Sequence, residues 1–182
     1  MRVRVLSLAA LALAFSCPLV ANGHQEQKET AAQGPTKVTI NGRTHPDLLP
    51  AHLVWESFFR SILSYVRDED GNVAEDKVSA LAKHNLKIPV SEVRAVLQVA
   101  EETVKRCSEL REPLDKEHAT GVDLGWTLEK RRAQVQASMQ VIVDGRDELT
   151  YKLSRKSFSA VKHYVATAIA PGTVMDIYLP IR

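Results

Sequence analysis

A run of apolar residues at helical spacing between residues 89 and 114 constrains the fold more than any other feature of this chain. Its members follow one another at three or four positions, so on a helix with 3.6 residues per turn they form one stripe. The stripe consists of Val93, Leu97, Ala100, Val104, Cys107, Leu110 and Leu114, widened on one side by Val96 and Val99. A helix of this length cannot cover its own apolar side. The stripe therefore predicts a fold of packed amphipathic helices.

Two shorter helices are expected before the stripe. The first runs from about residue 51 to 67 and is the most apolar, with Trp55 at the margin of its buried side. The side expected to be buried carries Val54, Phe58, Ile62 and Tyr65. A second helix is expected over residues 73–84, and Asn72 followed by Glu75 resembles the capping box that begins a helix.

Two further helices are expected after the stripe. Residues 128–153 carry apolar residues at heptad-like spacing, and Asp123 or Thr127 is the expected N-cap. Gly145 falls inside this pattern and weakens the prediction of one continuous helix. Ser154 then caps a last helix. The connections are short, so successive helices are expected to be antiparallel neighbours.

Residues 37–40 and 173–179 are short β-rich segments near the two ends of the domain. Pairing them would join these ends. Pro113, near the end of the stripe, must either kink that helix or end it. Together these patterns predict an all-α fold, an up-down bundle of four to five helices, with or without one short two-stranded β pair joining the N- and C-terminal ends of the domain.

The N-terminal residues have the pattern of an export signal. Arg2 and Arg4 precede an apolar run over residues 5–15, which is too short to span a bilayer. Ala21 and Gly23 supply the small residues that signal peptidase requires. The expected division is a signal peptide at residues 1–23, a polar disordered linker at residues 24–36, and a helical domain at residues 37–182. The mature protein would be periplasmic or extracellular.

Cys17 offers an alternative, a bacterial lipoprotein anchored to a membrane through a lipid on this cysteine. Ala14 and Phe15 depart from the usual lipobox, in which leucine and a small residue stand at these positions. Membrane attachment is expected only if Cys17 is lipidated.

Charge excludes one class of partner. Without residues 1–23 the 24 basic residues fall to 22, which equals the 22 acidic ones. A nucleic-acid-binding domain needs a strong basic excess, so no nucleic acid is expected. Cys107 is then the one cysteine left, which rules out an internal disulfide. It is expected to act as a small buried apolar residue, with an intermolecular disulfide or a reactive thiol as the alternative.

The segment over residues 45–60, HPDLLPAHLVWESFFR, resembles uncharacterised exported helical proteins of bacteria. The resemblance covers about a tenth of the chain. It implies export from a bacterium, and it implies no activity and no functional residue.

No standard catalytic or metal-binding motif is present in the sequence. Asp68, Asp70 and Asn72 could supply oxygen ligands to calcium, but the glycine and glutamate of an EF-hand loop are missing, and a solvated turn is the simpler interpretation. A second candidate is a metal site or proton relay formed by three residues that lie close in the sequence, with an ordinary loop as the alternative. These residues are Glu117, His118 and Asp123.

Basic residues gather in two places in the second half of the chain. One is the triplet Lys130, Arg131 and Arg132, and the other is the doublet Arg155 and Lys156, accompanied by Lys152 and Lys162. Such groups are usually solvated helix faces. The functional alternative is binding to an anionic surface such as phospholipid or lipopolysaccharide.

These observations favour an exported, non-enzymatic helical module that binds a protein or an envelope surface, with no catalytic, cofactor or metal residue assigned. The alternative is a small-ligand carrier or an enzyme whose site lies between helices, where residues such as His52, His118 or His163 would converge. A third alternative is self-association into a homodimer through the helix stripes. A solid core favours the module, whereas a deep polar cavity between helices would favour the carrier or the enzyme.

Overall fold

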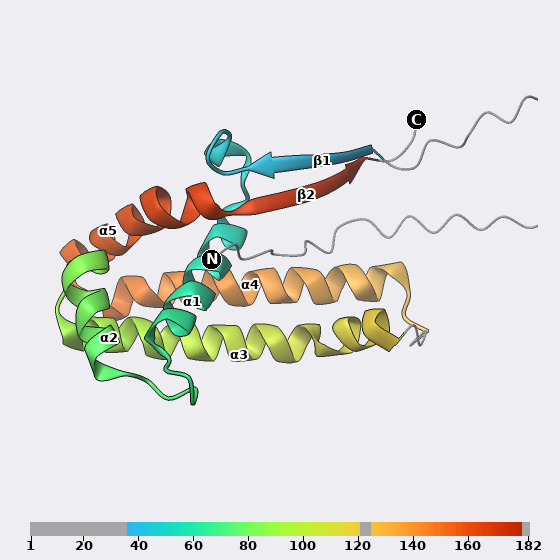
Figure 1. Ribbon diagram of the computed structural model, residues 1–182. Helices are drawn as coiled ribbons and strands as arrows, with labels where there is room; N and C mark the ends of the chain where they lie inside the picture. Colours follow the sequence, from blue (N-terminus) through green and yellow to red (C-terminus); the bar gives the residue numbers. More distant parts are fainter. Residues whose placement is uncertain (1–35, 121–124, 180–182) are drawn as a thin grey trace, which may run out of the picture.

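A computed structural model describes residues 36–120 and 125–179 of this chain. The predicted signal peptide, the predicted linker up to residue 35, Cys17 and Asp123 lie outside the described residues. The main elements are β1 (Thr36–Asn41), α1 (Ala51–Val66), α2 (Glu75–Ala80), α3 (Val90–Thr120), α4 (Leu128–Lys152), α5 (Arg155–Tyr164) and β2 (Val174–Leu179). The predicted all-α bundle with one two-stranded β pair is confirmed (Figure 1).

The long helices α3 and α4 lie side by side and antiparallel, and they form the base of the fold (Figure 1). The predicted stripe faces the core. Val93, Val96, Val99 and Ala100 have no exposed surface, and Cys107 is 1% exposed. Val104 and Leu110, nearer the far end of the pair, are partly buried. The spacing in the sequence thus identified the buried side of α3 correctly.

Gly145 explains how closely the two long helices approach each other. It is buried inside α4, which is continuous from Leu128 to Lys152. A Cβ atom at this position would lie 2.2 Å from Thr103 Oγ1 on α3. No side chain fits in that distance, so glycine is required by packing. The close contact between α3 and α4 therefore outweighs the low helix propensity of glycine.

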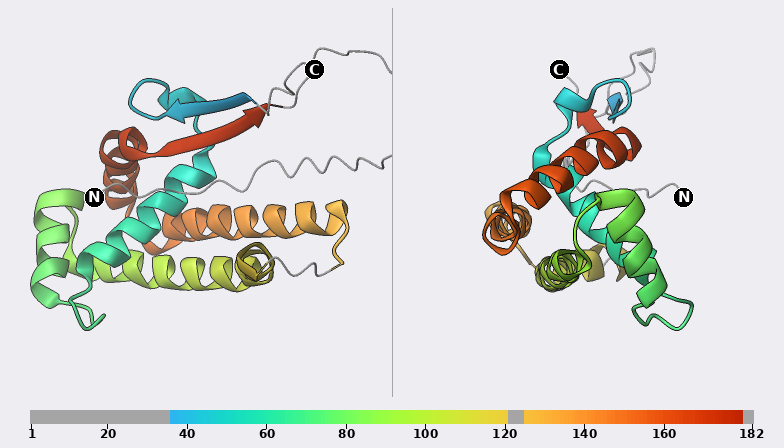
Figure 2. Two further views of the ribbon diagram at one scale, coloured as in Figure 1. Left: turned by 45° about the vertical axis from the view of Figure 1, so that its right-hand side comes forward. Right: turned by 90° about the vertical axis from the view of Figure 1, so that its left-hand side faces the viewer.

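Pro113 does not end α3, which continues to Thr120. The last turns of the helix leave the line of the earlier ones, as Figure 2 shows. Of the two alternatives that proline allowed, the structure has the kink.

Helix α1 crosses the α3–α4 pair obliquely (Figure 2) and places Phe58, Phe59 and Ile62 in the core. Two expectations for this helix were wrong. Trp55 is only 7% exposed, because its ring stacks against that of Phe158 on α5 at a centroid distance of 6.4 Å. Tyr65 is 44% exposed, so the buried side of α1 does not extend to this position.

Helix α2 begins later than expected. Its N-cap is Ala74, without a side-chain hydrogen bond, so the predicted capping box of Asn72 and Glu75 is wrong. The backbone N–H of Asn72 instead donates to Asp68 Oδ1 at 2.8 Å, within the preceding turn. A π-helical turn, Leu81–Leu86, extends α2, and the whole stretch over residues 75–86 is called the α2 region below.

Strands β1 and β2 pair in antiparallel fashion, so the two ends of the domain meet as predicted. Val38 lies opposite Ile177 and Ile40 opposite Met175, which makes one face of the ribbon apolar. Met175 at the base of the ribbon is buried, and Ile40 and Ile177 pack against the core. A membrane-spanning helix is not found among the described residues, since none combines the necessary length and apolar character.

Candidate functional site

A largely buried polar cluster lies between α1, α3 and α4. Glu56 on α1 accepts two hydrogen bonds from Arg111 on α3, at 2.7 and 3.0 Å, and one from Arg60 Nε at 3.0 Å. The Arg111 guanidinium also donates to Ser138 Oγ on α4 at 3.3 Å. The Glu56 side chain is 4% exposed and that of Arg111 is 24% exposed. This arrangement is a fork-to-fork ion pair that joins three helices.

The chemistry of this cluster is that of a closed structural contact. Burial tends to lower the pKa of Arg111, but the hydrogen bond and charge of Glu56 outweigh it and raise that pKa further above its usual range. Burial raises the pKa of the neighbouring Cys107 thiol, so the nucleophilic thiolate is disfavoured. Among the described residues, every buried side-chain nitrogen and oxygen atom has a hydrogen-bond partner. The cluster therefore leaves no polar atom aimed at a ligand.

His52 was one of the histidines that could have marked a site between helices. It lies one turn before Glu56 on α1 and is half-buried. Burial lowers the pKa of His52, with Arg111 acting in the same direction and Glu56 in the opposite one. His163 is exposed on α5, which is not one of the helices that form this cluster. The side chain of His118 is not described. The three histidines are therefore not shown to converge.

Of the two metal candidates, only the first lies within the described residues, since Asp123 and the side chain of His118 from the second are outside them. Asp68 and Asp70 are exposed in the α1–α2 turn, where Asp68 accepts the Asn72 N–H. Glu117 accepts two hydrogen bonds from Arg131 on α4, at 2.7 and 2.8 Å. Within residues 36–120 and 125–179, no group of three His, Cys, Asp or Glu side chains could hold a metal ion.

The basic triplet at the start of α4 is partly used inside the fold. Arg131 pairs with Glu117, and Lys130 Nζ lies 4.5 Å from the ring centroid of Trp126. Thr127 caps the helix by accepting from the Lys130 N–H at 3.2 Å, which confirms one of the two predicted caps. Two of the three basic side chains thus stabilise the end of the α3–α4 pair.

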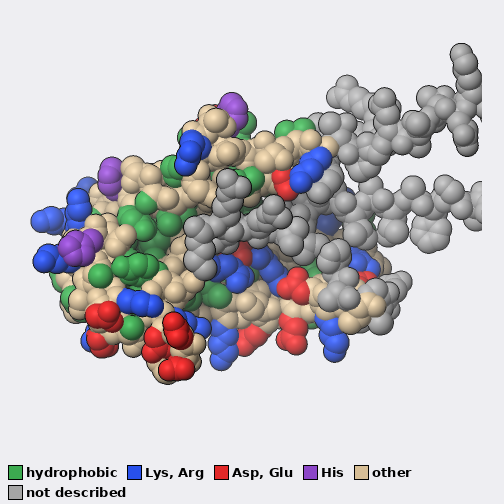
Figure 3. Space-filling view, in the orientation of Figure 1, with side chains coloured by type: hydrophobic (Ala, Val, Ile, Leu, Met, Phe, Trp, Pro, Cys, Tyr) green, Lys and Arg blue, Asp and Glu red, His purple; other side chains and the backbone are tan. Residues whose placement is uncertain are grey.

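The basic residues of α5 have a different setting. Arg155, Lys156 and Lys162 are all exposed. The α2 region, which contacts α5, and the connector after it carry two further exposed lysines, Lys83 and Lys87. The five residues are called the basic surface below. In Figure 3 basic and histidine side chains gather at this end of the molecule, while acidic ones lie lower, toward the α1–α2 turn.

The sequence carries a signal for this surface that the motif search missed. No aspartate or glutamate occurs between Asp76 and Glu92, or between Glu148 and Asp176. The fold packs these two acid-free segments together, and Asn85 Nδ2 donates to the Tyr164 hydroxyl at 3.5 Å across the contact. Neither segment is notable alone, and only their contact brings the exposed basic residues of both to one end of the molecule.

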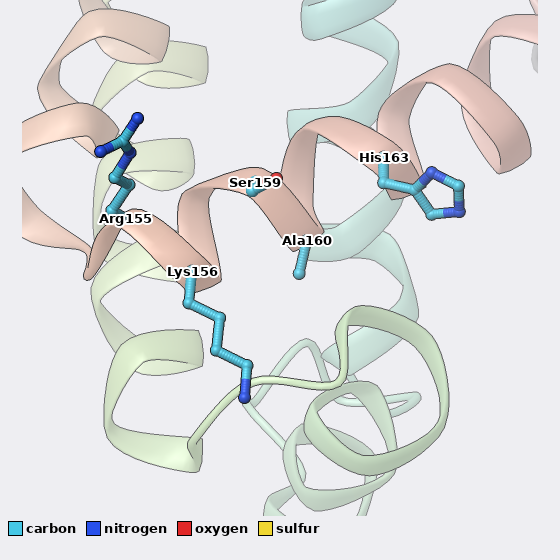
Figure 4. Close-up of a pocket in the computed structure, with 5 residues that line it drawn as sticks. All are labelled: Arg155, Lys156, Ser159, Ala160 and His163. Carbon is cyan, nitrogen blue, oxygen red and sulfur yellow. The ribbon is translucent and has the colours of Figure 1, made fainter.

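A shallow hollow lies on the outer side of α5 within this surface. It is lined by Arg155, Lys156, Ser159, Ala160 and His163. Figure 4 shows Lys156 and Ala160 directed toward the segment that joins the α2 region to α3, with Arg155 directed away from it. The hollow is open, so it suits a flat or extended anionic partner better than an enclosed substrate.

The first turn of α5 is also held by an acid from α3. Ser154 caps the helix by accepting from the Ser157 N–H at 3.3 Å, as predicted. Glu92 accepts from the Ser154 N–H at 3.1 Å and from its hydroxyl at 3.5 Å. The hydrogen bond from the Ser157 side chain has the largest effect and lowers the pKa of Glu92 below its usual value. Burial, the next largest effect, opposes it, and the two hydrogen bonds from Ser154 lower the pKa further.

Replacement of Glu92 by glutamine should therefore reduce stability in a pH-dependent way. The pKa of Glu92 is lower in the folded than in the unfolded chain, so the carboxylate stabilises the fold above the ordinary glutamate pKa of 4.5 and loses this effect as the pH falls through the lowered value. Because the group is largely solvated, the loss near neutral pH should stay below about 1 kcal/mol. Urea unfolding at neutral and at acidic pH measures it, with Glu102→Gln as the exposed control on the same helix. A difference that persists unchanged at acidic pH would contradict the assignment.

Comparison of the chain with models of known protein families, with curated proteins and with solved structures finds no match.

Proposed function

We propose that this chain is an exported, non-enzymatic helical module that binds an anionic envelope surface through its basic surface. The observation that carries the proposal is the contact between two acid-free segments, on which Lys83, Lys87, Arg155, Lys156 and Lys162 are all exposed. Each basic residue near an anionic membrane adds about 1 kcal/mol of attraction. Several of them on one face are enough for reversible binding.

The position of Arg155 and Lys156 adds support. They occupy the first turn of α5, where the helix dipole favours acids and disfavours cations. The helix dipole thus opposes the basic residues that are present, and the Glu92 carboxylate at the same turn offsets part of this cost. Residues that break a local rule are expected at functional places, and the hollow beside them is open to a large partner.

The core argues for a module rather than an enzyme. The charged groups buried between α1 and α3 are engaged in the Glu56–Arg111 pair, and the two hollows beside α5 are open. Export remains part of the proposal and rests on the pattern of residues 1–23. Sequencing the N-terminus of the protein recovered after secretion from a bacterial host tests it separately, with His24 as the expected first residue.

The binding test uses the processed protein and sedimenting vesicles of phosphatidylglycerol or phosphatidylcholine. Binding to the anionic vesicles, its loss at high salt, and none to the neutral vesicles are expected. The double variant R155Q/K156Q should bind roughly 30-fold more weakly, since two charges at about 1 kcal/mol each are removed.

The matched control is K105Q/R106Q, which removes the same charge from exposed positions in the middle of α3. It should bind within about twofold of the unchanged protein if location and not net charge decides. Equal losses in both variants, or equal binding to both lipids, would refute the basic surface as the site.

A further inference from the structure

A second hollow lies on the other side of α5, where that helix meets α1 and α4. It has a volume of about 540 Å³ and an apolar floor that includes Leu49, Val54, Trp55 and Phe158. This volume is within the range of small-molecule sites in proteins. The floor is rigid, because the rings of Trp55 and Phe158 stack at 15° and Trp55 also packs edge-on against Phe58. This hollow is called the groove below.

Charged residues stand at the rim of the groove. Lys162 lies on the α5 side, with its Nζ 5.4 Å from the ring centroid of Phe158. Arg146 and Asp147 lie on the α4 side and are paired at 2.6 Å. Two cations against one acid leave the rim positive, and Lys162 is also a member of the basic surface.

We infer that the groove binds the chain of a single-chain anionic amphiphile, of which a fatty acid is the simplest example. The apolar floor would cover the alkyl chain, and Lys162 together with Arg146 would hold the carboxylate at the rim. The inference rests on the proposed function, because an anionic envelope is the source of such molecules, and it adds a defined ligand class and a second site to it.

Trp55 gives a direct readout, since it is one of two tryptophans in the chain. In a Trp126→Phe background, Trp55 alone fluoresces, and dibromostearate should quench it in a saturable way that stearate does not. Calorimetric titration of the unchanged protein with fatty acids provides a measurement that does not depend on that substitution. Affinity should rise roughly twofold to fourfold for each added methylene until the groove is filled.

The groove and its rim are tested by separate variants. Ala166 lines the groove and is exposed, so Ala166→Phe should block it and reduce binding at least tenfold. Ala168→Phe, an exposed position of the same turn outside the lining, should leave binding unchanged. Lys162→Met should weaken binding of the fatty acid several-fold and reduce its advantage over the corresponding neutral alcohol.

Absence of saturable quenching, equal quenching in Ala166→Phe and Ala168→Phe, or equal affinity of the unchanged protein for acid and alcohol would overturn the inference. These titrations are made without vesicles and below the micelle concentration, so they do not depend on binding to a surface. R155Q/K156Q should bind vesicles roughly 30-fold more weakly and keep fatty-acid binding. Failure of the vesicle test alone would thus contradict the proposed function. Failure of the quenching test alone would contradict ligand binding in the groove.

Discussion

Replacing Arg111 by methionine should lower the free energy of unfolding by about 3 kcal/mol, because it leaves a buried carboxylate without its main partner. Glu56 is 4% exposed and would keep only the hydrogen bond from Arg60. The estimate is at the lower end of the range for broken buried pairs, since the Arg111 side chain is itself 24% exposed. Urea unfolding of the two proteins measures the difference.

A double variant separates the ion pair from the packing around it. Glu56→Met with Arg111→Met replaces both charges by apolar chains, and its stability should return to within about 1 kcal/mol of the unchanged protein or exceed it. Arg106→Met, an exposed position on the same helix, is the control and should have little effect. A double variant as unstable as Arg111→Met would show that packing of the arginine, and not the unpaired charge, causes the loss.

Phe58→Ala should be the most destabilising single substitution in the core, at about 3–5 kcal/mol. Phe58 has no exposed surface. The centroid of its ring lies 5.6 Å from that of Trp55, 5.5 Å from that of Phe59 and 6.3 Å from that of Tyr164. Removing the ring leaves a cavity where α1 meets the end of α5, and the stacked neighbours are too rigid to fill it.

The measurement is again urea unfolding, followed by Trp55 fluorescence to report on the aromatic cluster. Phe58→Leu is the matched control, since it keeps most of the volume and should cost no more than about 2 kcal/mol. If Phe58→Ala costs as little as Phe58→Leu, the side chain is not in a close-packed core. The same result would weaken the argument for a rigid floor in the groove.

Local periodicity predicted the elements that depend on neighbours in the sequence. The stripe on α3, the caps at Thr127 and Ser154, and the β-rich ends were all identified, because each needs only spacing or a side chain that reaches its own backbone. The boundary of α2 was missed because the turn before it uses Asn72 for its own hydrogen bond with Asp68. Whether Asn72 takes part in the turn or in a helix cap depends on competition between these two local structures. A capping motif in the sequence does not show which of them forms.

The candidate site could be predicted only in part. Arg155, Lys156 and Lys162 were identified as a basic group, but Lys83 and Lys87 were not connected with them. The buried ion pair of Glu56 was not predicted from the sequence, because its partner Arg111 is 55 positions away. The sequence determined which side of α3 is buried, since that follows from a period of 3.6 residues. Tertiary packing decided which helix covers that side, and hence where Trp55, Gly145 and the two acid-free segments lie. It did so because contacts between distant residues leave no periodic pattern in the sequence.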